Sequence, residues 1–218
     1  MIKFIAAISM LVDHIGFVFF PHVIWFRVIG RLAMPMFAFA MARAFSSVDI
    51  NNPMEDNKAK KYFFRLLIFS IISQIPYQFM FGYGFNIGFT WLIGFLILYT
   101  YTHHKNYKGI FIIIFLLLFP ASTAISYGIS GVLYPLMLYL CIYRKKSYNY
   151  AILGSIILYG IYIIQYQMNI VQMAAIVAVP LIMLLIKKDN IIRLNKWFYY
   201  AFYPVHMAIL VIIKYFLI

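Results

Sequence analysis

The stretch IKFIAAISMLVDHIGFVFF, residues 2–20, is apolar almost throughout, yet it carries Asp13 and His14 in its interior. A helix of about 20 apolar residues spans the hydrocarbon core of a bilayer. A charged side chain at that depth costs roughly 2.5 to 3.5 kcal/mol on insertion scales, so it seldom lies there without a partner or a task. The stretch therefore predicts a first membrane-spanning helix that carries functional polar groups.

The rest of the chain repeats this apolar pattern. It has 218 residues, of which 66% are hydrophobic and 11% are charged, and its mean hydropathy is +0.92. The apolar runs lack the water-facing stripe of a soluble helical protein and the period-two alternation of a membrane barrel. We predict an all-α, polytopic bundle of transmembrane helices that forms a single domain over residues 1–218.

The apolar runs predict about nine membrane spans. They cover residues 2–20, 24–45, 62–81, 87–102, 109–125, 127–143, 148–165, 169–186 and 197–217. No cleavage site of the small-x-small type follows the first run, so we expect this span to be retained rather than removed as a signal peptide.

Connections that carry lysine or arginine alternate along the chain with connections that carry neither. Residues 46–61, 103–108, 144–147 and 187–196 carry them, and the intervening connections do not. The positive-inside rule then predicts a cytoplasmic amino terminus and an external carboxyl terminus. The formal net charge of +13 is accounted for in this way, so no nucleic-acid partner is predicted and membrane lipids are the expected surroundings.

With this orientation, the depth of the first polar residues in the membrane can be estimated from their positions along the predicted spans. Asp13 lies past the middle of its span, and Arg31 lies about eight residues, or roughly 12 Å, below the outer surface. We predict that they form an ion pair, with either a structural or a direct chemical role. Arg27 precedes Arg31 by four residues and shares its helical face. Arg27 is close enough to the outer surface for its side chain to extend its charged group to the water. The alternative role for Arg27 is substrate binding.

Further polar residues fall in the outer half of the predicted spans. They are Ser70, Gln74, Gln78, Asn86, Thr90, Tyr203 and His206. A cavity that opens to the outer face would gather polarity in this way. His14 and His206 are each either a general base or a member of an interhelical hydrogen bond. His103 and His104 lie beside a basic loop without further ligands at suitable spacing, so no metal site is predicted.

Five sequence blocks carry a family resemblance. They are IKFIAAISMLVDHIG at 2–16, IGRLAMPMFAFAM at 29–41, KYFFRLLIFSIISQIPYQF at 61–79, FNIGFTWLIG at 85–94 and FYYAFYPVHMAIL at 198–210. Together they resemble the TraX family of conjugal-transfer pilin acetylation proteins. The last block also resembles the wider membrane acyltransferase superfamily.

The resemblance implies N-terminal acetylation inside a bacterial cytoplasmic (inner) membrane, with acetyl-CoA as acyl donor. Gln74 and Gln78 stand where members of the family often carry an acidic residue. The acceptor is therefore left open between a peptide and a small-molecule amine.

Acetyl transfer assigns roles to these residues. A base for the amine is expected from His14 or His206, and Asp13 would orient Arg31 or a histidine. Contacts to the substrate are expected from Arg27, Arg31, Gln74, Gln78, Asn86, Thr90 and Tyr203. The phosphates of acetyl-CoA would need cations at the cytoplasmic side, and Lys61, Arg65 and Arg193 lie at that level.

Two other classes of function are compatible with the sequence. A transporter or flippase of an anionic or amphipathic substrate would also place arginine and histidine at mid-depth. A non-catalytic membrane scaffold would use the same aromatic spans without needing His206. Since neither a P-loop nor a nucleophile elbow is present, a nucleotide hydrolase and an α/β esterase are disfavoured.

Overall fold

A computed structural model describes residues 1–46, 53–103, 124–166, 169–188 and 194–217. Within these ranges the chain is helical, and Phe85 and Ile125 form an isolated bridge. The predicted all-α helical bundle is confirmed.

The described residues up to 103 form five helices. They are α1 (Ile2–Phe19), α2 (Ile24–Gly30), α3 (Ala33–Ser46), α4 (Pro53–Phe81) and α5 (Ile87–His103). In the second half, α7 (Gly128–Leu138) continues into the π-helical η2 (Tyr139–Arg144), and α8 (Tyr148–Tyr166) follows. The last elements are the 3-10 turns η3 (Ile170–Val177) and η4 (Ile186–Lys188), which flank α9 (Ala178–Leu185), and then α10 (Lys196–Leu217).

The number of long apolar helices differs from the predicted nine spans. Six helical stretches within the described part of the chain are long and apolar enough to cross a membrane: residues 2–19, 24–46, 56–81, 148–166, 170–188 and 196–216. Two more predicted spans appear as shorter apolar helices, 87–103 and 128–144. The predicted span 109–125 lies almost entirely outside the described residues. The protein is thus a multi-pass membrane protein.

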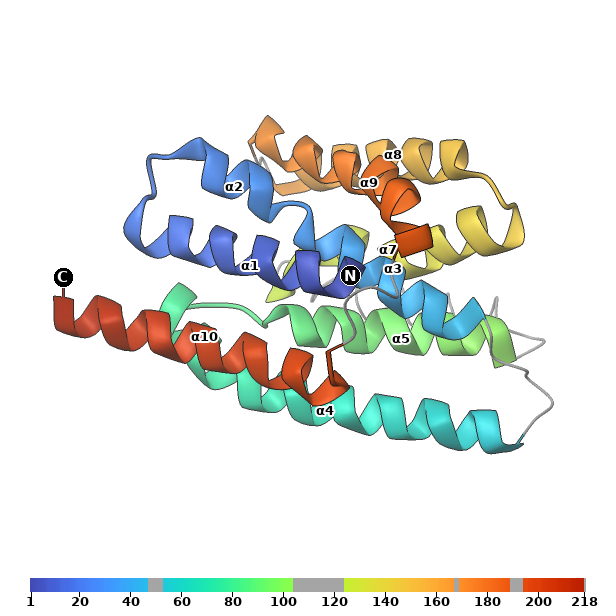
Figure 1. Cartoon of the computed structure of the whole chain (residues 1–218), viewed down its shortest axis with the longest axis horizontal. Helices are drawn as coiled ribbons and strands as arrows, with labels where there is room; N and C mark the ends of the chain where they lie inside the picture. Colours follow the sequence, from blue (N-terminus) through green and yellow to red (C-terminus); the bar gives the residue numbers. More distant parts are fainter. Residues whose placement is uncertain (47–52, 104–123, 167–168, 189–193, 218) are drawn as a thin grey trace.

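The helices are stacked in tiers (Figure 1). Helices α4 and α10 lie along one side and pack on each other, and α8 and α9 lie along the other side. Between them run α1, α3 and α5, and α3 also contacts α7 and α9. Large apolar side chains on the outward faces of α4, α8 and α10 are exposed, for example Ile75, Ile164 and Ile212. These are the surfaces that hydrocarbon would cover.

One membrane span is interrupted between α2 and α3, around Arg31 and Leu32. Pro35 lies in the first turn of α3 and has no N–H to donate to the carbonyl of Arg31, which favours the break. Gly30 lets the interrupted segment approach α1 closely, because a Cβ at this position would lie 2.3 Å from the Cβ of Asp13. The sequence thereby brings α2 directly onto the acidic residue of α1.

Most of the described basic residues gather toward the end of the molecule at which α1, α4, α8 and α10 begin. We call this end, marked by Lys3, Lys58, Lys145 and Lys196, the basic end. The opposite end carries the turn between α4 and α5, in which Tyr83 is 78% exposed.

The predicted orientation can be tested by cysteine labelling. In a Cys141→Ser background, a membrane-impermeant maleimide should label Tyr83→Cys in intact cells and Lys145→Cys only after permeabilisation, because basic loops stay in the cytoplasm. Both positions are exposed, so accessibility within the protein does not limit the reaction. Equal labelling of both cysteines in intact cells would contradict the orientation.

Candidate functional site

An ion-pair cluster joins α1 to the interrupted span. The Asp13 carboxylate lies 2.8 Å from Arg31 Nη2 and 3.0 Å from Arg27 Nη1. The predicted pair of Asp13 and Arg31 is present, and Arg27 adds a second cation on the other carboxylate oxygen. The Arg27 side chain remains 32% exposed, so it combines this contact with access to the surroundings. Two guanidinium groups facing one carboxylate leave the cluster with a net positive charge.

Arg31 also ties this cluster to the second half of the chain. Its Nη1 donates to the Tyr127 hydroxyl at 3.2 Å and to Gln172 Oε1 at 3.1 Å. The residue is only 5% exposed. A buried guanidinium needs its charge paired and its donors satisfied, and these contacts meet that need across several helices.

The two histidines of the membrane interior are hydrogen-bonded to each other. His14 Nδ1 lies 2.7 Å from His206 Nε2, and the rings stack with their centroids 5.0 Å apart. His206 Nδ1 lies 2.6 Å from the carbonyl oxygen of Phe202. Both histidines are buried, and the His14 ring is also within 6 Å of the rings of Phe81 and Tyr203.

The carbonyl partner assigns the positions of the protons. A carbonyl oxygen only accepts, so His206 Nδ1 carries the hydrogen, and with both rings neutral His206 Nε2 accepts from His14 Nδ1. The remaining nitrogen, His14 Nε2, then holds a lone pair. His14 is thus oriented by His206 as a base is oriented by a second group.

His14 faces a cavity of about 380 Å³ that we call the polar cavity. Its wall includes the ion-pair cluster of Asp13, Arg27 and Arg31. It also includes tyrosines from five parts of the described chain, namely α4, the turn before α5, the residue before α7, α8 and α10: Tyr77, Tyr83, Tyr127, Tyr162, Tyr166 and Tyr203. His14 and the two arginines thus border a single space.

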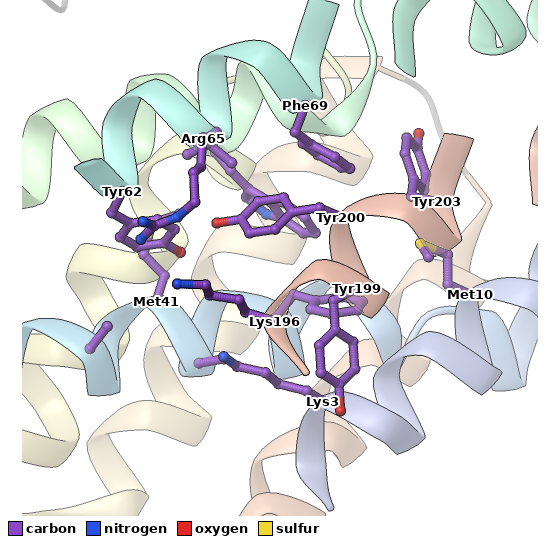
Figure 2. Close-up of a pocket in the computed structure, with 15 residues that line it drawn as sticks. Lys3, Met10, Met41, Tyr62, Arg65, Phe69, Lys196, Tyr199, Tyr200 and Tyr203 are labelled. Atoms are coloured by element: carbon purple, nitrogen blue, oxygen red, sulfur yellow. The ribbon is translucent and has the colours of Figure 1, made fainter. Parts of the chain in front are cut away.

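A second cavity, of about 300 Å³, lies toward the basic end, and we call it the basic cavity (Figure 2). Lys3 of α1, Arg65 of α4 and Lys196 of α10 contribute cations to its wall. Figure 2 shows the amino groups of Lys3 and Lys196 on the side of Tyr62 and Arg65, with Tyr203 at the other side. Arg65 Nε is buried with no hydrogen-bond partner among the described residues.

The two cavities share part of their walls. Met10, Phe37, Trp91 and Tyr203 line both of them, and we call these four residues the partition. Phe37 and Trp91 pack against each other with ring centroids 5.2 Å apart. Trp91 Nε1 is buried with no hydrogen-bond partner among the described residues. A single layer of side chains therefore separates the cationic cavity from the one that holds His14.

Four predicted substrate-binding residues lie away from both cavities, within the part of the chain that is described. Gln74 accepts hydrogen bonds from Asn86 N and Nδ2 and donates to the Gly84 carbonyl at 2.8 Å. Gln78 donates to the Gly82 carbonyl at 2.8 Å. Thr90 donates to the Ser126 carbonyl at 2.7 Å. Gln74, Gln78 and Asn86 thus hold the turn between α4 and α5, whereas Thr90 ties α5 to the segment before α7. The substrate-binding role of these residues stays a prediction.

The predicted phosphate-binding cations are only partly brought together. Arg65 lines the basic cavity, whereas Lys61 is exposed and absent from its described lining. Arg193 lies outside the described residues. Sequence reasoning missed Lys3 and Lys196. Each lies seven residues before a partition residue, Met10 or Tyr203, on the same face of its helix, and this spacing was the signal that could have found them.

In the described residues, no cluster of three or more histidine, cysteine, aspartate or glutamate side chains is arranged to hold a metal ion. The described side chains that line the polar cavity with His14 supply carboxylate, guanidinium and hydroxyl groups.

Comparison with known proteins gives a family match and two relatives. The TraX protein family model matches residues 1–214. The probable fimbrial assembly protein FimC, serogroup H1, of Dichelobacter nodosus is 27% identical over 99% of this chain and 95% of its own length. The uncharacterized protein RP591 of Rickettsia prowazekii (strain Madrid E) is 35% identical over 34% of this chain and 25% of its own length. No solved structure matches.

Proposed function

The chain belongs to the TraX protein family, and from that premise we propose that it is a membrane-embedded N-acetyltransferase. It would transfer the acetyl group of acetyl-CoA to an amino group of a peptide or another membrane-associated amine. The observation that carries the proposal is the hydrogen-bonded pair of His14 and His206. His14 lines a cavity that shares four wall residues with a cationic cavity.

The reaction can be written with these residues. The acceptor amine attacks the thioester carbonyl as His14 Nε2 removes a proton from its nitrogen. The carbon–sulfur bond then breaks, the amide forms, and the proton passes from His14 to the departing CoA sulfur. While His14 is protonated, its Nδ1–H donates to His206, whose Nδ1–H donates to the Phe202 carbonyl. This relay spreads the positive charge.

The basic cavity is suited to the acetyl-CoA donor. Lys3, Arg65 and Lys196 provide positive charge for phosphate groups. The unpartnered Arg65 Nε–H supports a ligand at this position, because buried donors are normally satisfied. The cations belong to the basic end. We propose that this end lies on the cytoplasmic side of a bacterial inner membrane, because acetyl-CoA is made in the cytoplasm.

The polar cavity is suited to the acceptor. The excess positive charge of Arg27 and Arg31 over Asp13 disfavours an ammonium ion and favours the neutral amine, which is the nucleophile. The Dichelobacter nodosus relative is named as a probable fimbrial assembly protein. This supports the amino terminus of a fimbrial or pilus subunit as the acceptor.

The proposal is tested by transfer of labelled acetyl groups. The purified protein in lipid nanodiscs should pass label from acetyl-CoA to a synthetic apolar peptide with a free α-amino group. It should not pass label to the same peptide with a formylated amino terminus. Mass spectrometry of peptides and lipids from cells that express the protein identifies the natural acceptor. Absence of labelled product in both experiments would refute the proposal.

The donor site gives a separate prediction. Removing one cation from the basic cavity, in Lys196→Gln or Arg65→Gln, should raise the KM for acetyl-CoA by about tenfold, since a charged contact to phosphate contributes about 1.5 kcal/mol or more. The turnover number should change little, because these residues do not touch the reacting atoms. Lys61→Gln is the matched control at the same end of α4. An unchanged KM in both cavity variants would place acetyl-CoA elsewhere.

A transporter remains the second candidate. Two cavities divided by a thin layer also resemble the closed site of a protein that opens alternately to each side. In that case labelled acetyl-CoA enters liposomes as the intact molecule. An acetyltransferase instead leaves the labelled acetyl group on the acceptor and releases free CoA.

A further inference from the structure

The partition lies where the acyl group must be during transfer. Met10 and His14 are four residues apart on α1 and share one face, about 6 Å apart along the axis. Met10 lines both cavities, whereas His14 lines only the polar cavity within the described chain. A thioester that enters from the basic cavity therefore meets Met10 before its carbonyl carbon reaches an amine held by His14.

We propose that the partition, with Met10 as its adjustable member, restricts the donor to short acyl chains. This inference rests on the proposed acyltransferase function and assigns a specificity-determining role to residues that the transfer reaction itself does not require. Beyond the thioester carbonyl, an acyl chain has to lie among Met10, Phe37, Trp91 and Tyr203.

The composition of the partition supports a size limit. Met10 and Tyr203 are 8% and 3% exposed, and Phe37 and Trp91 are partly buried, so the layer leaves limited room for added volume at Met10 and Tyr203. Packed interiors resist added volume, and each extra methylene forces side chains from their preferred positions. An acetyl group adds one methyl beyond the carbonyl, whereas a butyryl group adds three carbons. A methylene in an apolar pocket changes kcat/KM by about tenfold or more, so the wild-type protein should discriminate strongly against butyryl-CoA.

Met10 is the member that can be changed most safely. Methionine is unbranched and fills irregular space, whereas Tyr203 contacts the His14 ring and Trp91 packs on Phe37. Shortening Met10 enlarges the partition directly and leaves the hydrogen bond between the histidines in place.

The chain offers two matched methionine controls. Of these two cavities, Met41 lines the basic cavity alone and Met34 the polar cavity alone, as far as the described lining goes. Both are buried to a similar extent as Met10. Truncating either one to alanine enlarges a cavity without opening the partition. A change of specificity caused by cavity volume alone would appear in all three variants.

The experiment measures kcat/KM for acetyl-CoA, propionyl-CoA and butyryl-CoA with the free-amine peptide as acceptor. Met10→Ala should raise the ratio of butyryl to acetyl transfer by about tenfold or more, whereas Met34→Ala and Met41→Ala should change it by less than about threefold. Met10→Val, a smaller truncation, should shift the ratio in the same direction by less. This variant keeps the test valid if Met10→Ala does not fold.

The possible outcomes distinguish a failure of the partition's role from a failure of the proposed acyltransferase function. Acetyl transfer by the wild-type protein with an unchanged ratio in both Met10 variants would overturn the inference and leave the acetyltransferase function standing. An equal shift in the three alanine variants would also overturn it. If the wild-type protein transfers no acyl group at all, the proposed function fails and the inference fails with it.

Discussion

His14→Gln is expected to lower the turnover number for acetyl transfer by about a hundredfold or more, because general-base catalysis contributes about 10² to 10⁴ in rate. The variant should still fold and bind acetyl-CoA, since His14 lines the polar cavity rather than the basic one. The measurement is single-turnover transfer of labelled acetyl to the free-amine peptide, with acetyl-CoA binding measured in parallel.

His206→Gln should act differently, because His206 reaches the reaction only through His14. We expect a smaller loss of turnover and a retained pH dependence. The base must be unprotonated to act, so the rate falls as the pH falls. That acidic limb should persist in His206→Gln and disappear from any residual activity of His14→Gln. A purely structural role for His206 would lower stability and leave the turnover number of the folded protein unchanged.

His22→Gln is the matched control for both variants, since His22 is an exposed residue between α1 and α2. It should have wild-type turnover. If His14→Gln and His206→Gln both transfer acetyl at the wild-type rate, histidine has no place in the mechanism. Loss of binding together with turnover would instead show that the pair maintains the fold.

Asp13→Asn is expected to destabilise the protein by roughly 3 to 5 kcal/mol, because it leaves a buried guanidinium without its counter-charge. Arg31→Gln should cost less, since Asp13 keeps its contact with Arg27 at 3.0 Å. The double variant should be more stable than Asp13→Asn, because it removes one of the two cations left by that change. Denaturant unfolding in detergent measures the three free energies.

Lys60→Gln is the control for this cycle. It breaks the exposed pair of Lys60 with Asp56, whose two side chains are 62% and 34% exposed, and water screens such a pair. Its free energy of unfolding should stay close to that of the wild type. If the double variant is no more stable than the worse single variant, the cluster is not coupled through charge. If the double variant folds but does not transfer acetyl, the pair also belongs to the reaction site.

The sequence alone determined the class of the protein and the positions of its polar groups along the predicted spans. Continuous apolar runs require helices in a membrane, because every backbone polar group must be satisfied within the segment. Position along a helix also gives depth at 1.5 Å per residue. That was enough to predict the contact of Asp13 with Arg31, since two opposite charges at one depth in low dielectric strongly favour pairing.

Depth does not say which helices are neighbours or how each is rotated about its axis, and only the tertiary structure decided these. The contact between His14 and His206 joins residues 192 positions apart, and a neutral imidazole can be satisfied by many other partners. Gln74 has a polar spacing that suggests a cavity wall, yet packing turned it toward Asn86 and the turn backbone. The two cavities and the partition depend on side chains from several helices, so their existence follows from helix packing and not from the periodicity of any single span.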